Sequence, residues 1–113
     1  MTPDPLHDIV ISETARKKRD RYLRPDQLRR TLRNGSGSVY RRSSPNHDGL
    51  YDESRFILRG TFHGKDLDIV FVVERTTITV VTQMGQHATT MQGRFYDEVG
   101  RTAADAVAWV RVE

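Results

Sequence analysis

The amino-acid sequence predicts an α+β fold: a short N-terminal strand, two basic helices packed on an antiparallel sheet of three to five strands, and a short C-terminal helix. Residues 55–84 contain three segments in which apolar and polar residues alternate with the period of a β-strand. Residues 13–33 combine helix signals with few apolar residues, so these helices are expected to be stable only when they pack on the apolar face of the sheet. A chain of 113 residues corresponds to one domain and can bury a core without disulfides or metals.

The N-terminal segment predicts a strand followed by a helix. Residues 6–11 are mostly apolar and are typical of a short strand. Ser12 is a good helix N-cap, and Glu13 suits the positive end of a helix dipole, so we expect the first helix over residues 13–23. Its inward-facing apolar residues are few: Ala15, Tyr22 and Leu23.

The second helix is expected over residues 25–33. Pro25 ends the first helix and fits the first turn of the second. Leu28 and Leu32 share one face at a spacing of four residues, and Asn34-Gly35 is a strong helix stop. A flexible link, a further strand and a loop follow over residues 35–38, 39–42 and 43–52.

The clearest element is a β-hairpin formed by residues 55–62 and 67–73. His63-Gly64 is expected to form its two-residue turn. This turn keeps the large apolar side chains on one face, and a slip of one residue would expose them, so the register is strongly specified. The predicted cross-strand pairs are Phe56 with Phe71, Leu58 with Ile69 and, on the opposite face, Arg59 with Asp68.

A third antiparallel strand is expected over residues 76–84, after a two-residue turn at Glu74-Arg75. That turn pairs Phe71 with Ile78, and Ile69 with Val80. Four residues should then face the helices, namely Ile78, Val80, Thr82 and Met84, whereas Gln83 should face away from them.

The C-terminal region is the least regular part. Residues 85–100 show no clear period, but Thr102 to Asp105 resembles a capping box and predicts a short helix after it. We therefore expect residues 1–113 to form a single domain with its core over about 6–84. Residues 85–113 would be an extension that docks a partner or a second copy of the chain.

Positive charge is concentrated in one segment. Residues 16–42 carry eleven Lys or Arg against Asp20 and Asp26, whereas the formal net charge of the whole chain is only +3. Such a block is typical of a site for RNA or DNA, although a solvated helix face is the alternative interpretation. The candidate nucleic-acid-binding residues are Arg16, Lys17, Arg21, Arg29, Arg30, Arg33, Arg41 and Arg42.

Several classes of protein are disfavoured. The chain has no cysteine, and its four histidines are scattered without metal-ligand spacing, so we expect no metal site and no cofactor. It carries no nucleotide-binding, P-loop or hydrolase motif. The N-terminus does not resemble a signal peptide, and the longest apolar run, residues 69–73, is too short to span a bilayer. We therefore expect a soluble, cytoplasmic protein that does not bind membranes.

The order of elements resembles the RelE/ParE-type toxins, which share the barnase–EndoU–colicin–RelE fold. The resemblance covers about residues 9–84, and the chain looks most like small uncharacterised relatives of that group. It is carried by the segment Ile11-Ser12-Glu13-Thr14-Ala15, the Arg/Lys-rich helix, the Arg59–Lys65 hairpin and the segment Ile78-Thr79-Val80-Val81-Thr82.

The resemblance implies metal-independent cleavage of mRNA or another RNA, with a cognate antitoxin or the ribosome as partner. It makes Arg59, His63 and Lys65 the catalytic candidates: Arg59 would hold the phosphate, His63 would transfer a proton, and Lys65 would offset developing charge. For His63 the alternative is a purely structural turn. Relatives commonly carry histidine where this chain has Thr14, which puts catalysis in doubt without affecting RNA binding.

Two other functions fit the same residues. The first is a non-catalytic nucleic-acid-binding module, of viral or mobile-element origin. The second is a protein-interaction domain, in partnership with another protein or as a homo-oligomer, that uses the edge of the sheet or the C-terminal helix.

Overall fold

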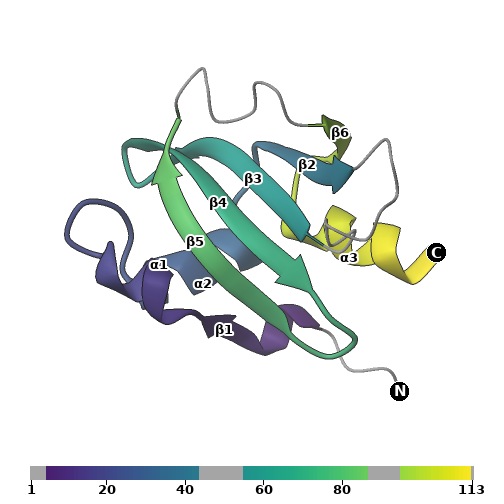
Figure 1. The fold of residues 1–113 in the computed structure, drawn as a ribbon, viewed down its shortest axis with the longest axis horizontal. Helices are drawn as coiled ribbons and strands as arrows, with labels where there is room; N and C mark the ends of the chain where they lie inside the picture. Colours follow the sequence, from purple (N-terminus) through teal and green to yellow (C-terminus); the bar gives the residue numbers. More distant parts are fainter. Residues whose placement is uncertain (1–4, 44–54, 87–94, 113) are drawn as a thin grey trace.

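The structure is a computed structural model, and it describes residues 5–43, 55–86 and 95–112. Within these residues a six-stranded mixed sheet has the strand order β1-β5-β4-β3-β2-β6 (Figure 1). The strands are β1 (Ile9–Ile11), β2 (Ser38–Ser43), β3 (Arg55–Phe62), β4 (Lys65–Val73), β5 (Ile78–Gly85) and β6 (Phe95–Gly100). The helices are the 3-10 turn η1 (Pro5–His7) and the α-helices α1 (Glu13–Lys17), α2 (Pro25–Asn34) and α3 (Ala103–Val112).

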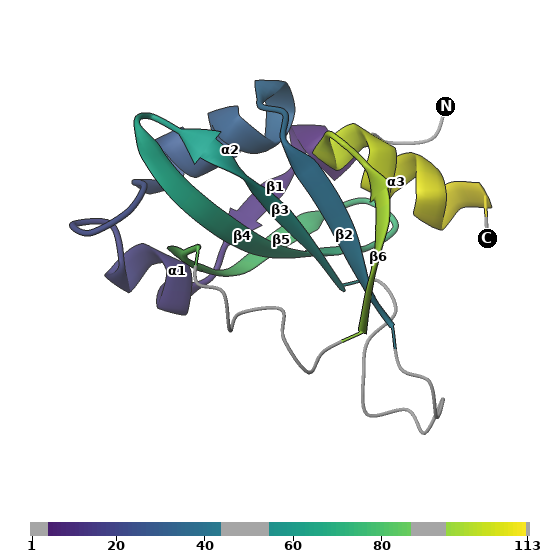
Figure 2. The same ribbon diagram turned by 90° about the horizontal axis from the view of Figure 1, so that it is seen from above.

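The core lies between one face of the sheet and the helices. Figure 2 shows α2 and α3 side by side on the same face of the curved sheet. Phe56 of β3 is fully buried there and stacks on Phe71 of β4, with ring centroids 5.7 Å apart. The ring of Trp109 from α3 makes a T-shaped contact with Phe56, with ring centroids 6.3 Å apart. The expected α+β class, with helices covering an apolar sheet face, is therefore confirmed.

The first hairpin has the predicted register. Phe56 pairs with Phe71, Leu58 with Ile69, and Arg59 with Asp68. His63 and Gly64 form the turn with φ angles of 52° and 78°, because a two-residue turn that matches the strand twist needs positive φ at both positions.

The predicted register of the second hairpin was wrong by two residues. Val73 pairs with Ile78 and Phe71 with Val80, and the amide of Glu74 donates to the Thr77 carbonyl (2.8 Å). The turn therefore lies one residue later than expected, which lets Val73 and Ile78 bury each other.

An irregularity between Val70 and Phe71 then shifts the pairing of β5. Val70 lies opposite Thr82, and Ile69 lies opposite Gln83, so one extra residue of β5 has no partner across the ladder. Gln83, expected to face away from the helices, is instead fully buried on their side. Thr82 and Met84, expected to face the helices, lie on the other side.

The N-terminal elements differ from the prediction in length. The first strand covers Ile9–Ile11, because Pro5–His7 forms the 3-10 turn, and it pairs with β5 in parallel. Helix α1 ends at Lys17 rather than at residue 23, since its few apolar residues support little more than one turn. Ser12 caps α1 as expected, accepting a hydrogen bond from the Ala15 amide (3.2 Å). Helix α2 and strand β2 lie where the sequence predicts them.

The C-terminal region belongs to the same core. Strand β6, which the sequence did not reveal, pairs with β2 and makes the sheet larger than predicted. The expected C-terminal helix is present as α3, and its capping box forms: the Asp105 amide donates to Thr102 Oγ1 (3.3 Å) and the Thr102 amide donates to Asp105 Oδ2 (3.0 Å). Ala103, Ala106 and Val107 are buried, so α3 is a structural element of the domain.

Most of the loop predicted over residues 43–52 lies outside the described residues, and Ser43 is the last residue of β2. No helix in the described part of the chain is long and apolar enough to cross a membrane.

Candidate nucleic-acid interface

Arg59, the predicted phosphate ligand, is held by a carboxylate. Its Nε and Nη2 donate to the two oxygens of Asp68 at 2.7 and 2.8 Å. The Asp68 side chain is completely buried, while 30% of the Arg59 side chain is exposed. This bidentate hydrogen bond to Asp68 raises the pKa of Arg59 above its usual value. The guanidinium therefore neutralises a buried charge and uses two of its five N–H donors to do so.

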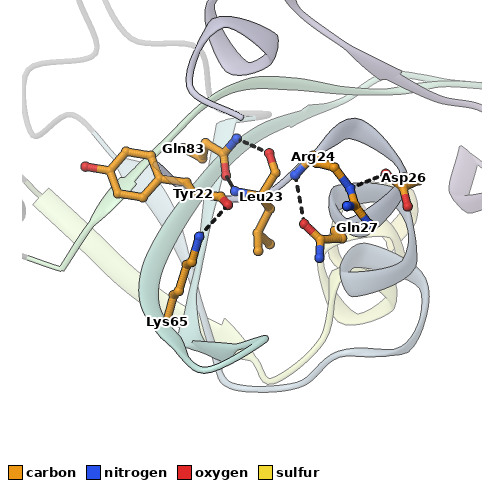
Figure 3. A network of polar contacts seen from close by, with 7 residues as sticks. All are labelled: Tyr22, Leu23, Arg24, Asp26, Gln27, Lys65 and Gln83. Atoms are coloured by element: carbon orange, nitrogen blue, oxygen red, sulfur yellow. Dashed lines mark hydrogen bonds and ion pairs between the residues drawn. The ribbon is translucent and has the colours of Figure 1, made fainter. Parts of the chain in front are cut away.

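Lys65 has a structural role at the other side of the hairpin. Its Nζ donates to the backbone carbonyl of Tyr22 (2.8 Å; Figure 3). It also donates to the carbonyl of Arg21 (3.3 Å), and so anchors the loop between α1 and α2. Lys65 pairs with Phe62 and shares its face, whereas Arg59 lies on the opposite face of β3. The structure therefore does not bring Arg59 and Lys65 together.

Three arginines close the free edge of β1. Arg29 Nε donates to the Ile9 carbonyl (3.1 Å) and Arg16 Nε donates to the Ile11 carbonyl (3.1 Å). Arg33 Nε donates to the carbonyl of Leu6, just before the strand (2.9 Å). An edge strand otherwise presents unpaired backbone groups to other chains. These arginines thus protect the sheet edge, a role that the charge pattern alone did not suggest.

The outer side of α2 forms a cationic hollow. A cavity of about 320 Å³ is lined by Asp26, Arg29, Arg30, Arg33 and Asn34. Asp26 is engaged by Arg24 at 3.3 Å. Within the described residues, no carboxylate pairs with Arg29, Arg30 or Arg33. The hollow therefore carries net positive charge, and the Nη atoms of Arg29 and Arg33 remain available as donors while Nε fixes each side chain.

A second hollow adjoins the first at the C-terminal end of α2. Its volume is about 250 Å³, and it is lined by Arg30, Thr31, Asn34, Gly35, Thr61, Phe62 and His63. Arg30 and Asn34 line both hollows. His63 is exposed at the tip of the β3–β4 turn, so this predicted catalytic residue lines the same hollow as Arg30 of α2.

The remaining predicted basic residues lie elsewhere. Arg41 stacks on the Trp109 ring at 4.3 Å and lies 3.9 Å from Asp97, which fixes α3 against β2 and β6. Arg21 lies over the ring of Tyr22, 5.9 Å from its centroid. Two more line neither hollow: Lys17, which pairs with Glu13 on the surface (3.9 Å), and Arg42 of β2.

Sequence reasoning missed Asn34 and Thr61 as site residues. Asn34 was interpreted only as a helix stop, although it lies four residues after Arg30 and therefore on the same helix face. Thr61 could have been found from its position near the end of β3, beside the hairpin turn, where its hydroxyl donates a hydrogen bond to Asp66 (2.5 Å). Only the packing of α2 against this turn shows that the two residues share a hollow.

The comparisons with known proteins add no relative. No protein family, no curated protein and no solved structure matches this chain. The resemblance to RelE/ParE-type toxins therefore stays a hypothesis. Among the described residues, no group of three or more His, Asp or Glu side chains is placed to hold a metal ion.

Proposed function

We propose that this protein binds the sugar–phosphate backbone of nucleic acid through the outer side of α2. The observation that carries the proposal is the cationic hollow, in which Arg29, Arg30 and Arg33 have no carboxylate partner among the described residues. Phosphate oxygens are the natural acceptors for guanidinium groups, which bind them through two parallel hydrogen bonds.

Fixed side chains favour this function over a merely solvated helix face. The hydrogen bonds from Arg29 to the Ile9 carbonyl of β1 and from Arg33 to the Leu6 carbonyl of η1 hold both guanidinium groups in place before any ligand arrives. Less side-chain entropy is then lost on binding, which improves affinity.

Salt dependence tests the proposal. Arg30 is the best residue to change, because it is exposed and makes no side-chain hydrogen bond in the described part of the chain. Arg30→Ala should weaken RNA and DNA binding without loss of stability, and should reduce the slope of log K against log salt by about 0.7–0.9.

Arg75→Ala is the matched control, since Arg75 is exposed in the turn between β4 and β5 and lines neither hollow. An affinity that stays constant between low and high salt, or an equal effect of the two variants, would exclude backbone binding at α2.

The second candidate function is metal-independent RNA cleavage, as the toxin resemblance implies. The observation that favours it is the position of His63 beside Arg30 in the second hollow. An imidazole exchanges protons near neutral pH, and a neighbouring guanidinium stabilises charge that develops on a phosphate. In this arrangement His63 and Arg30 replace Arg59 and Lys65 as the reactive groups, and an antitoxin or the ribosome remains the proposed partner.

Cleavage is tested by incubating RNA with the protein in EDTA, with and without ribosomes. His63→Ala should lower the cleavage rate by about 100-fold or more while RNA affinity is retained. If the unaltered protein leaves RNA intact in both conditions, nucleic-acid binding without catalysis is the function that remains.

A further inference from the structure

The second hollow differs chemically from the cationic hollow beside it. Apart from Arg30 and His63 its lining is uncharged, with the amide of Asn34 and the hydroxyl of Thr61 among its polar groups. Arg30 lies at the boundary, because it lines both hollows. We infer that the second hollow accepts one unpaired nucleoside of a single-stranded nucleic acid, whose phosphate lies on Arg30. This inference rests on the proposed binding at α2.

The geometry suits a single nucleotide. Arg30 and Asn34 are four residues apart on α2, so their Cβ atoms are about 6 Å apart on the same helix face. A phosphate on Arg30 therefore places its own sugar and base within reach of Asn34. A base inside a duplex has its pairing edge occupied, so only an unpaired base can present that edge to a protein side chain.

The polar groups provide a means of distinguishing bases. The Asn34 amide offers two donors and an acceptor, which matches the mixed donor and acceptor edges of nucleobases. His63 is exposed and offers an aromatic face or a ring N–H. Thr61 is already bonded to Asp66, and this bond fixes its hydroxyl beside the hollow.

The absence of a side chain at Gly35 allows the hairpin to approach the helix end. A Cβ atom at this position would lie 2.6 Å from the Thr31 carbonyl oxygen and 3.2 Å from the Phe62 ring. The φ angle of Gly35 is −79°, so close contact, rather than backbone conformation, is the reason for glycine here. Phe62, which is 6% exposed, thereby forms an aromatic floor of the hollow.

Fluorescence anisotropy with labelled single-stranded octamers tests the inference. The probes are ribo-octamers of each base, their deoxy counterparts, an abasic octamer, a duplex and inorganic polyphosphate. The unaltered protein should prefer one base over the weakest by about tenfold, and should bind abasic octamers and the duplex less tightly than that octamer. The deoxy octamers show whether the ribose 2′-hydroxyl contributes.

Asn34→Ala and the isosteric Asn34→Asp, which lacks the amide donors, should each remove most of this base preference. Asn34→Ala should lower affinity for the preferred octamer more than affinity for the abasic octamer or for polyphosphate, whereas Arg30→Ala should weaken binding to every probe. Thermal unfolding of each variant shows whether the fold is retained.

Two results would overturn the inference while backbone binding survives. One is equal affinity of the unaltered protein for abasic and base-containing octamers. The other is a base preference that persists in both Asn34 variants. If the unaltered protein binds neither polyphosphate nor any octamer, the proposed function itself fails.

Discussion

Gln83 in β5 binds both backbone groups of Leu23, in the loop between α1 and α2. Its Oε1 accepts a hydrogen bond from the Leu23 amide (2.9 Å), and its Nε2 donates to the Leu23 carbonyl (2.8 Å) (Figure 3). The same Nε2 also donates to the Ala15 carbonyl (3.0 Å). The side chain is fully buried. A single amide thus satisfies both backbone groups of Leu23, and Lys65 holds the carbonyls of Arg21 and Tyr22 in the same loop from the hairpin side.

Gln83→Leu should lower the free energy of unfolding by roughly 3–5 kcal/mol, because it leaves buried backbone groups of Leu23 without partners. Chemical denaturation measures this change. Gln86→Leu is the matched control: Gln86 also donates to two carbonyls, those of Gly60 (3.0 Å) and Leu67 (3.3 Å), but it is exposed, and its loss should cost less than about 1 kcal/mol. Equal effects of the two substitutions would contradict the role given to Gln83.

Arg59→Leu should destabilise the fold by about 3 kcal/mol or more, since it leaves the Asp68 carboxylate buried and unpaired. The double variant Arg59→Leu/Asp68→Leu should recover most of that stability, because two apolar side chains can replace a buried ion pair. A double-mutant cycle by urea unfolding provides the test. If the double variant is no more stable than Arg59→Leu, the buried charge is not the cause. Because Arg59 stabilises the fold, loss of RNA cleavage in an Arg59 variant would indicate a catalytic role only if that variant is shown to be folded.

His63→Asn should raise the free energy of unfolding by about 0.5–1 kcal/mol, because asparagine adopts positive φ more readily than histidine. The same substitution should remove cleavage if His63 transfers a proton. Thermal unfolding and RNA cleavage are measured on the same samples, with His63→Val as the control that should lower stability. A less stable His63→Asn variant would show that the histidine makes contacts that the turn requires.

Asp105 should make stability depend on pH in the acid range. Hydrogen bonds from the backbone amides of Arg101 and Thr102 hold the pKa of Asp105 below its usual value of 3.8. A lowered pKa in the folded state means that Asp105 stabilises the fold above about pH 3.8 and loses this contribution as the pH falls through the folded pKa. Asp105→Asn keeps an oxygen acceptor but does not titrate, so its unfolding free energy should change less between pH 6 and pH 2. An identical pH dependence of the two proteins would exclude this contribution.

The register of the β3–β4 hairpin could be predicted to the residue because two independent signals agree, although β4 begins at Lys65 rather than at residue 67. The alternation of apolar residues and the turn at His63-Gly64 define the same register, including the pair of Arg59 with Asp68. No such agreement exists in β5. Val80 and Val81 are both apolar, so the alternation does not reveal which of them lies at the irregularity. The irregularity reverses the alternation after Val81, and this is why Gln83 faces inward.

The parallel pairing of the predicted strand β1, and strand β6 as a whole, were missed for a different reason. Each strand is short, and each is defined by a partner that is distant in the sequence, β5 for one and β2 for the other. For the candidate site, the sequence identified the arginines of α2 and the exposed His63. It did not show that a buried carboxylate engages Arg59 or that backbone carbonyls engage Lys65, because both depend on packing between segments.

The parallel pairing of β1 with β5 has a consequence for how the protein is made. A nascent chain that has not yet reached residue 80 has no strand on which Ile9–Ile11 can align, and closing so long a loop is a late and entropically costly event. Arg16 and Arg29 are fixed through carbonyls of that strand. An emerging polypeptide therefore carries the positive charge early in translation, whereas the strand that fixes Arg16 and Arg29 joins the sheet only after β5 has been made.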